Sequence, residues 1–342
     1  MIFSRRNKLV IAITVVVVAV ILIAIGLWQF FNKKESQAPI DNRAEQPEII
    51  NRHLLNGQPL GDNPKPFFPV AVMIDNAWDI RPQYGLAPAD IIYEALAESN
   101  ITRLMAVYDS NSKVDKIGPV RSAREYFLDW ADDYPGSVYM HVGGSPTALA
   151  RIDYHYFEDI DQIGVGETYF WRDNKFTAPR NVFTSDSNWL RVGELRDLPR
   201  AGEALIGWNF QEASTTASNR IKDLSIDYNE IYKVDWRYNE KLGFYERWQG
   251  GEPFIYDSGD QAHADNIIVQ IVPSRVVDDL GRRVMDTKKG GQVFIFNRLG
   301  VQQGTWTREV RTMFFDENLK ELQLVPGKTW VQIIDSDEIL KY

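Results

Sequence analysis

The hydrophobic positions of this chain form one long run near the start and many short runs further on. Leu9 to Trp28 is a stretch of 20 residues without a charged side chain. A helix of that length spans about 30 Å, the hydrocarbon thickness of a bilayer. A basic segment precedes it, and basic flanks stay in the cytoplasm. The pattern therefore predicts a cytoplasmic end at 1–8 and one transmembrane helix at 9–31.

The alternative to a retained helix is a cleaved signal peptide. Ser36-Gln37-Ala38 resembles a small-residue cleavage site. The apolar run, however, is longer than the ~7–15 residues usual for the apolar part of a signal peptide. We therefore expect the helix to remain in the mature protein. Residues 32–66, with prolines scattered among polar residues, are typical of a linker.

Short apolar runs alternate with helix-like segments between residues 67 and 213. The strand candidates are 70–74, 104–108 and 138–142, and the helix candidates are 88–96, 121–134, a segment beginning at Ser145-Pro146, and 185–198. Strands alternating with helices favour a largely parallel sheet flanked by helices. The pattern predicts an α/β N-terminal domain over 67–213.

The pattern changes in the last third of the chain. Strand-like runs without intervening helices occupy 233–238, 244–248, 266–272, 292–297 and 329–334. Glycine- and proline-containing turns separate several of these runs. We therefore expect a β-rich C-terminal domain over 220–342.

Charge and composition narrow the classes of partner and site. The net charge of the chain is −9. The charged residues among the first 34 are all cationic (Arg5, Arg6, Lys8, Lys33 and Lys34), so the rest of the chain is more acidic than the total indicates. An acidic exterior argues against nucleic acid as a partner, because that binding needs basic surfaces. The chain has no cysteine, which excludes disulfides, thiolate zinc sites, a cysteine nucleophile and a lipidated cysteine. It has four histidines, so we expect no metal site and no cofactor.

Several long motifs of the chain occur together in one known family. They are Pro69–Asn76 (PVAVMIDN), Arg81–Gln83, Ala89–Ala95, Ile101–Arg103, Ile117–Arg124 (IGPVRSAR), His141–Pro146 (HVGGSP), Ala264–Gln270, Gly304–Trp306 and Gly327–Trp330. With these motifs the chain resembles the YerB-like family, built on the domain of unknown function 3048. The resemblance implies a two-domain bacterial cell-envelope protein and implies no activity. Many members resemble lipoproteins with a lipidated cysteine, whereas this chain would depend on its helix.

Arg121 and Arg124 are the strongest candidates for chemistry. They stand three residues apart at the start of a predicted helix and therefore share a face. Two guanidinium groups beside free backbone N–H groups would bind a carboxylate or a phosphate. The alternative is a structural network in which the two arginines pair with acids such as Asp75, Glu94 or Glu98.

Further candidates follow the predicted strands. Ligands of open α/β sheets bind at the carboxyl ends of the strands, and a histidine, a glycine turn and an Asp-Asn pair lie at such ends. The full set of predicted ligand-binding residues is Asp75, Asn76, Arg103, Arg121, Arg124, His141, Gly143, Gly144, Ser145 and Arg180. In the alternative interpretation, His141 is a core residue, Ser145 caps a helix, and the Asp-Asn pair is an ordinary turn.

Glu94 and Glu98 are weaker candidates, for catalysis. They stand four residues apart, which places them on one face of the predicted helix. Two carboxylates could act as acid and base in the cleavage of a glycan. The alternative is a solvated face or a salt-bridge partner, and Glu94, near the apolar stripe, would then need an arginine.

Three hypotheses follow for a single-pass membrane protein whose bulk lies outside the cytoplasm. The first is a module that binds an anionic or glycan ligand of the cell wall, the second a carboxylate-dependent hydrolase of wall polymer, and the third a scaffold that docks an envelope protein. A cleft that gathers Asp75, Arg121, Arg124 and His141 favours the first two. Two close carboxyls with a raised pKa favour the hydrolase, and a large apolar patch favours the scaffold.

Overall fold

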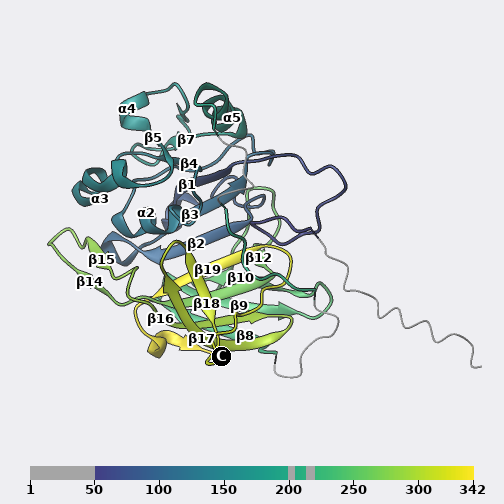
Figure 1. Cartoon of the computed structure of the whole chain (residues 1–342). Coiled ribbons are helices and arrows are strands. Elements are labelled where there is room, and N and C mark those ends of the chain that lie inside the picture. Colours follow the sequence, from purple (N-terminus) through teal and green to yellow (C-terminus); the bar gives the residue numbers. More distant parts are fainter. Residues whose placement is uncertain (1–50, 199–204, 213–219) are drawn as a thin grey trace, which may run out of the picture. The chain divides into compact units, whose positions relative to one another are not determined.

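A ten-stranded sheet forms the centre of the computed structural model, which describes residues 51–198, 205–212 and 220–342 (Figure 1). From one edge to the other, its strands are β18 (Thr312–Phe315), β17 (Gly300–Arg308), β16 (Gly291–Asn297), β13 (Asn266–Ile271), β19 (Thr329–Ile334), β2 (Ile91–Leu96), β3 (Thr102–Asp109), β1 (Pro69–Asp75), β4 (Val138–His141) and β5 (Glu158–Asp161). The parallel β2–β19 pair joins strands from the two predicted domains. Both segments of the chain therefore contribute to one sheet.

The predicted transmembrane helix at 9–31, its basic end at 1–8 and residues 32–50 of the linker lie outside the described residues. Within the described part of the chain, no helix is long and apolar enough to cross a membrane. The described residues belong to a compact unit that begins at Ile50.

The sheet is mixed, so the prediction of a mostly parallel sheet is wrong. Strands β1, β4 and β5 pair in parallel, as do β13, β19 and β2, whereas the other neighbouring strands are antiparallel. The reason lies in the connections. Only the short turn η2 (Glu98–Asn100) joins β2 to β3, and a parallel pair would need a much longer crossover.

The helix predicted at 88–96 is also wrong, because the segment forms β2. All six residues of this strand are buried. Ile92 packs in the core on one face of the sheet and Tyr93 in the core on the other face. A strand buried on both faces is a continuous apolar run, which periodicity alone does not distinguish from a buried helix.

Most of the other predicted elements are confirmed. The strand candidates match β1, β3, β4, β9, β10, β13, β16 and β19. The helices are α2 (Glu125–Ala131), α3 (Pro146–Arg151) and α5 (Asp186–Leu195), each inside or near its predicted range. The C-terminal part is β-rich, as predicted.

A smaller sheet from the C-terminal half covers one face of the central sheet. Its strands are β11 (Glu252–Pro253), β10 (Phe244–Gln249), β9 (Lys233–Asn239), β8 (Asp223–Asp227) and β20 (Leu340–Lys341), with β12 (His263–Ala264) paired to β10. The rings of Trp236 on β9 and Trp330 on β19 lie 5.3 Å apart at their centroids. Helix α5 packs into the same core through Trp189 and Val192.

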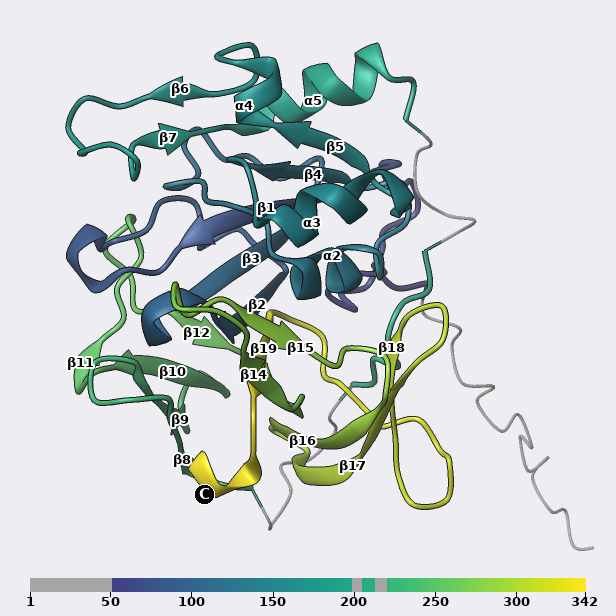
Figure 2. The same cartoon turned by 90° about the vertical axis from the view of Figure 1, so that its left-hand side faces the viewer.

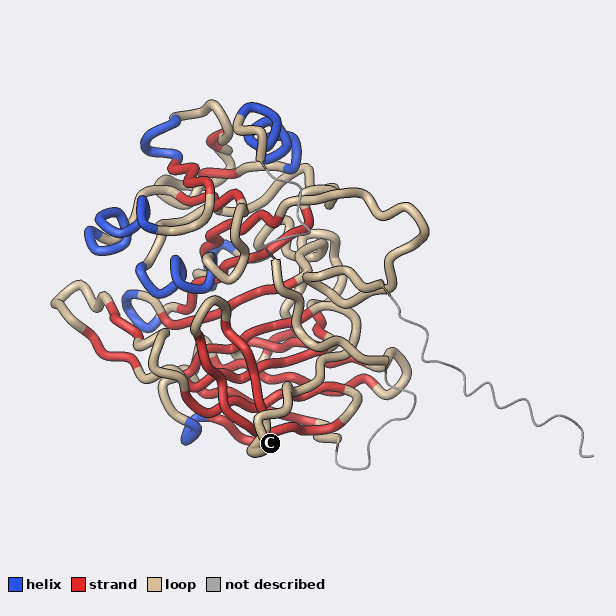
Figure 3. Tube along the Cα trace, viewed as in Figure 1, coloured by secondary structure: helices blue, strands red, loops and turns tan. Residues whose placement is uncertain are grey.

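Helices α2 and α3 cover the opposite face of the N-terminal strands, and Figure 3 shows most helices gathered in this half of the molecule. The ring of Trp130 on α2 stacks on that of Tyr93 at 5.9 Å. The remaining elements are short: α4 (Gln162–Val165), η1 (Trp78–Ile80), η3 (Ile152–Tyr154), η4 (Asp337–Ile339), β6 (Trp171–Arg172), β7 (Val182–Phe183), β14 (Ser274–Val276) and β15 (Arg283–Met285). The β14–β15 hairpin extends from the C-terminal half to lie beside α2 (Figure 2).

Candidate functional site: an arginine-lined pocket

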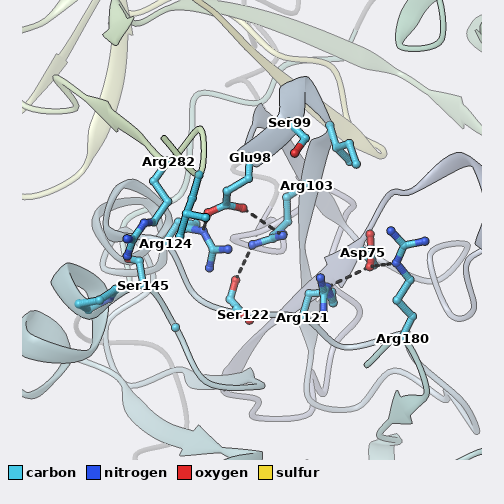
Figure 4. Close-up of a pocket in the computed structure, with 14 residues that line it drawn as sticks. Asp75, Glu98, Ser99, Arg103, Arg121, Ser122, Arg124, Ser145, Arg180 and Arg282 are labelled. Atoms are coloured by element: carbon cyan, nitrogen blue, oxygen red, sulfur yellow. Dashed lines mark hydrogen bonds and ion pairs between the residues drawn. The ribbon is translucent and has the colours of Figure 1, made fainter. Parts of the chain in front are cut away.

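An open cavity of about 420 Å³, here called the arginine pocket, lies where β1 ends and β3 begins (Figure 4). Strands β1 and β3 supply Asp75 and Arg103, η2 and its flank supply Glu98, Ser99 and Ile101, and the segment before α2 supplies Arg121, Ser122 and Arg124. The start of α3 supplies Gly144, Ser145 and Pro146, the loop before β7 supplies Arg180, and the β14–β15 hairpin supplies Leu280 and Arg282. The pocket thus combines residues from both halves of the chain.

The segment between β3 and α2 is held against the end of β1 by backbone hydrogen bonds. The Asp75 N–H donates to the carbonyl of Pro119 at 2.9 Å, and the Arg121 N–H donates to the carbonyl of Met73 at 2.9 Å. These bonds fix the backbone of Arg121 beside the strand end. Its side chain therefore meets that of Asp75 in the pocket.

The loop after β4 is closed by its own hydrogen bonds. The Gly143 N–H donates to the Asp161 carboxylate at 2.6 Å. The Ser145 N–H donates to the Ala123 carbonyl at 3.1 Å. The Ser145 Oγ accepts from the N–H of Ala148 at 3.2 Å and so caps α3. These two N–H groups are therefore bound within the protein and are not available to a ligand.

Asp75 holds two of the pocket's arginines together. Its Oδ2 lies 2.9 Å from the Nε of Arg121 and 3.6 Å from the Nε of Arg180. Arg180 also donates through one Nη to both carboxylate oxygens of Asp79, at 2.7 and 2.8 Å. Figure 4 shows Asp75 between the two guanidinium groups.

Glu98 holds a second pair of arginines. Its carboxylate accepts from the Nε of Arg124 and lies 3.5 Å from an Nη of Arg103. Burial raises the pKa of Glu98, but the hydrogen bond from Arg124 and the charges of both arginines outweigh it, so the pKa lies below its ordinary value. Burial, together with the neighbouring Arg124, lowers the pKa of Arg103 to about 10.

The alternative interpretation of the arginines, pairing with acids, is correct in part, because Arg121 pairs with Asp75 and Arg124 with Glu98. The pairing leaves donors unused. Both Nη groups of Arg121 have no hydrogen-bond partner among the described residues, and only Nε of the Arg282 guanidinium is bound, to Asp278 at 2.5 Å. The pocket therefore presents oriented N–H donors to its cavity.

Not every predicted ligand-binding residue reaches the pocket. His141 is fully buried, with its ring nitrogens 2.7 Å from an oxygen of Asp159 and 2.8 Å from the Gly143 carbonyl oxygen. Asn76 is also fully buried, and its amide donates to Thr102 at 2.7 Å. Both side chains, and Gly143, are absent from the pocket's wall. The remaining seven predicted residues line it.

Glu94 lies in the core instead of on a helical face. Its side chain is fully buried, and one oxygen lies 2.9 Å from an Nη of Arg247, which is fully buried as well. The same carboxylate accepts hydrogen bonds from Thr102 at 2.8 Å and from Trp330 and Gln332 at 3.1 Å each. The predicted pairing of Glu94 with Glu98 on one helical face is wrong, because β2 is a strand.

Sequence reasoning missed Leu280 and Arg282. The Asp278-Asp279 turn marks a hairpin, and Arg282 follows it directly. No local sequence pattern predicts that this hairpin packs against a site built mainly from residues 75–180. Only the packing of the β14–β15 hairpin beside the N-terminal half brings Arg282 there (Figure 4).

Comparison with known proteins places this fold in a family. Two family models match the chain: "Protein of unknown function (DUF3048) N-terminal domain" over residues 55–197 and "Protein of unknown function (DUF3048) C-terminal domain" over residues 224–331. A protein of Bacillus subtilis (strain 168) named "Putative lipoprotein YerB" is 31% identical over 272 residues, which cover 78% of this chain and 81% of that protein.

The fold agrees with this sequence match. The crystal structure of the YerB protein from Bacillus subtilis superposes with a TM-score of 0.76 at 29% identity, covering 85% of this chain and 99% of that chain. The resemblance stated from the motifs is thus confirmed. This chain belongs to the YerB-like family, which is built on the DUF3048 N-terminal and C-terminal domains.

Proposed function

We propose that this protein is a membrane-anchored, extracytoplasmic envelope protein whose arginine pocket binds an anionic ligand of the cell wall. The observation that carries the proposal is the convergence of five arginines on one open cavity. Among the described residues, two carboxylates, Asp75 and Glu98, line the same wall, while Asp79 and Asp278 pair with arginines from the rim. The cavity therefore has more donors than it has acceptors.

The arrangement of these donors suits a carboxylate or a phosphate. The guanidinium group presents N–H donors in a planar fork that matches both anions. Asp75 and Glu98 engage the Nε atoms of Arg121 and Arg124 and so orient the outer Nη groups. Donors that are held in place lose less conformational freedom when a ligand binds. The two acids thus support binding instead of cancelling it.

The location is proposed from the sequence and the relative. The apolar run from Leu9 to Trp28 is long enough for a bilayer, and the Bacillus subtilis relative is named a putative lipoprotein. Because this chain has no cysteine, a lipid on cysteine is excluded and the helix would be the anchor. Introducing Lys241→Cys should give a thiol that a membrane-impermeant maleimide labels in intact cells. If the maleimide instead labels the thiol of a Ser4→Cys variant in intact cells, the N-terminus lies outside and the proposed orientation is wrong.

The hydrolase alternative has less support. Glu98 has a lowered pKa, whereas a general acid needs a raised one. Glu94 is fully buried and bound through both oxygens. Neither carboxyl therefore has the environment of the general acid that glycan cleavage requires.

The scaffold alternative has one observation in its favour. An apolar depression of about 470 Å³ on the C-terminal half is lined by Ile206, Val310, Met313, Phe315 and Leu319. Ile206, Val310 and Leu319 are exposed to solvent. A protein partner could cover this surface without using the arginine pocket, so the two functions are compatible.

The binding test compares two double variants of the full chain on isolated cell-wall material. Arg121→Ala with Arg124→Ala removes two guanidinium groups from the pocket. Lys222→Ala with Lys241→Ala removes the same charge from exposed positions of the smaller sheet. We expect retention to fall at least about tenfold for the arginine variant, and to stay near the parental level for the lysine variant.

The melting temperature of both variants decides what a loss means. If the arginine variant is folded and is retained on cell-wall material as well as the parent, the result contradicts the proposal. If that variant unfolds, Arg282→Ala replaces it, because the Arg282 guanidinium bonds only to the rim residue Asp278. Parental retention by Arg282→Ala would then count against the pocket.

A further inference from the structure

The arginine pocket lies beside a second cavity. This outer cavity, of about 480 Å³, shares Arg121 and Arg180 with the arginine pocket. Its other wall is formed by Asp79, Ile80 and the loop 175–179 before β7. Because two side chains line both spaces, the cavities adjoin one another, and the two together are here called the groove.

Positive side chains occur along the whole of this groove. Arg124 and Arg282 line only the inner part, Arg121 and Arg180 line both parts, and Lys175 lines only the outer part. Lys175 is exposed, and its side chain makes no hydrogen bond or ion pair within the described residues. A ligand that enters the outer cavity therefore meets an ammonium group that forms no ion pair among the described residues and interacts with Asp173 only through its charge.

The shared wall is fixed in position. Arg180 is held by Asp79 at 2.7 Å from the rim and lies 3.6 Å from Asp75 below. Arg121 is held by the same Asp75 at 2.9 Å. These contacts use the Nε atoms and one Nη group, so donors of both side chains remain at the junction of the two cavities. If a ligand places one anionic group at the junction, the cations of the two cavities would also attract the anionic groups on either side of it.

We infer that the ligand of the proposed function is a linear polymer with repeating anionic groups, phosphate or carboxylate, and not a single small anion. A single small anion occupies a site in only one cavity and leaves the cations of the other without a role. A chain of anionic groups engages the inner arginines, the junction and Lys175 together. Binding of each further group is then intramolecular, which raises the overall affinity without any new type of contact. This inference rests on the proposed function of the arginine pocket.

The test measures binding to the full chain in detergent micelles by calorimetry at constant ionic strength. The probes are inorganic phosphate, inorganic polyphosphates of increasing length and poly-L-glutamate. We expect affinity to rise at least about tenfold from phosphate to a polyphosphate long enough to span both cavities, and then to level off. The glutamate polymer distinguishes the two chemistries, because it binds comparably only if carboxylates suffice.

Two single variants separate the groove from general charge. Lys175→Ala should weaken binding of the long polyphosphate several-fold and leave inorganic phosphate unaffected. Lys241→Ala, in the exposed turn between β9 and β10, should change neither. Both substitutions lie in exposed loops or turns, so the fold should be retained.

The outcomes distinguish the two proposals. If inorganic phosphate binds and depends on Arg121 and Arg124, but length and Lys175→Ala have no effect, the polymer inference is overturned and the proposed function stands. If long polymers bind with the same affinity to the Arg121→Ala, Arg124→Ala variant as to the parent, both are overturned. Length-dependent binding that requires Lys175 supports both.

Discussion

Arg247 and the arginines of the pocket use the same side chain in two different environments. Arg247 is fully buried, and its guanidinium lies 4.4 Å from the ring centroid of Trp330 and pairs with Glu94 at 2.9 Å. Burial lowers its pKa. Buried pairs of this kind are costly to break, by about 3–5 kcal/mol when one partner is removed. Arg121 and Arg124, by contrast, keep donors toward a cavity that is open to solvent, where a ligand can reach them.

Glu98 gives a prediction about acid stability. Its folded-state pKa lies below the ordinary value of 4.5, so its contribution to stability is present above that pH and is lost as the pH falls through the folded-state value. The variant Glu98→Gln lacks this contribution. We expect the parent to be more stable than the variant at neutral pH, with the difference shrinking as the pH falls below about 4.5. Urea unfolding of both proteins across this range measures it, and a difference that grows on acidification would contradict the account.

At the scale of elements, sequence patterns identified most strands but failed at β2. Runs such as Val70 to Ile74 are rich in β-branched residues and too short for a helix, so they are unambiguous. The β2 segment contains Ala95 and Leu96 and one glutamate, which also fit a helical face. As a strand it pairs with β3 on one side and with β19, more than 200 residues away in sequence, on the other. No local pattern contains the pairing with β19, which buries the strand inside the sheet.

The same limit applies to the site. Asp75 and Ser145 were predictable, because Asp75 ends a recognisable strand and Ser145 caps a recognisable helix. The prediction that Arg121 and Arg124 share the face of a helix is wrong, because α2 begins only at Glu125 and both arginines lie in the extended segment before it. Arg282 was not predictable, since its place depends on how the β14–β15 hairpin packs. His141 ends a strand as predicted. Its ring is buried between Asp159 and the Gly143 carbonyl, so it does not reach the pocket.

The N-cap of α3 provides a prediction for an element that borders the pocket. Ser145→Ala removes the hydrogen bond to the Ala148 N–H and should lower the free energy of unfolding by about 1 kcal/mol. Phosphate affinity should be unchanged, because the hydroxyl acts as a cap. Ser145→Asp retains a capping oxygen and places a negative charge at the pocket, so it should keep stability and weaken phosphate binding. Urea unfolding and calorimetry measure the two effects, and a loss of binding in Ser145→Ala would give the hydroxyl a direct role.

At the scale of the whole molecule, the site is completed by the packing of the two segments of the chain, which share one sheet. The β2–β19 pair joins them, and the turn after β2 carries Glu98, which orients Arg103 and Arg124. The hairpin of the C-terminal half adds Arg282 on the other side.

The central claim, that the arginine pocket attracts anions, is tested most directly by crystals of the protein grown in selenate. Selenate has the shape and charge of sulfate, and its selenium scatters anomalously. The account predicts an anomalous peak in the arginine pocket, within hydrogen-bond distance of the Nη atoms of Arg121 and Arg124. Crystals in which selenate occupies other surface sites while this pocket holds none would contradict it.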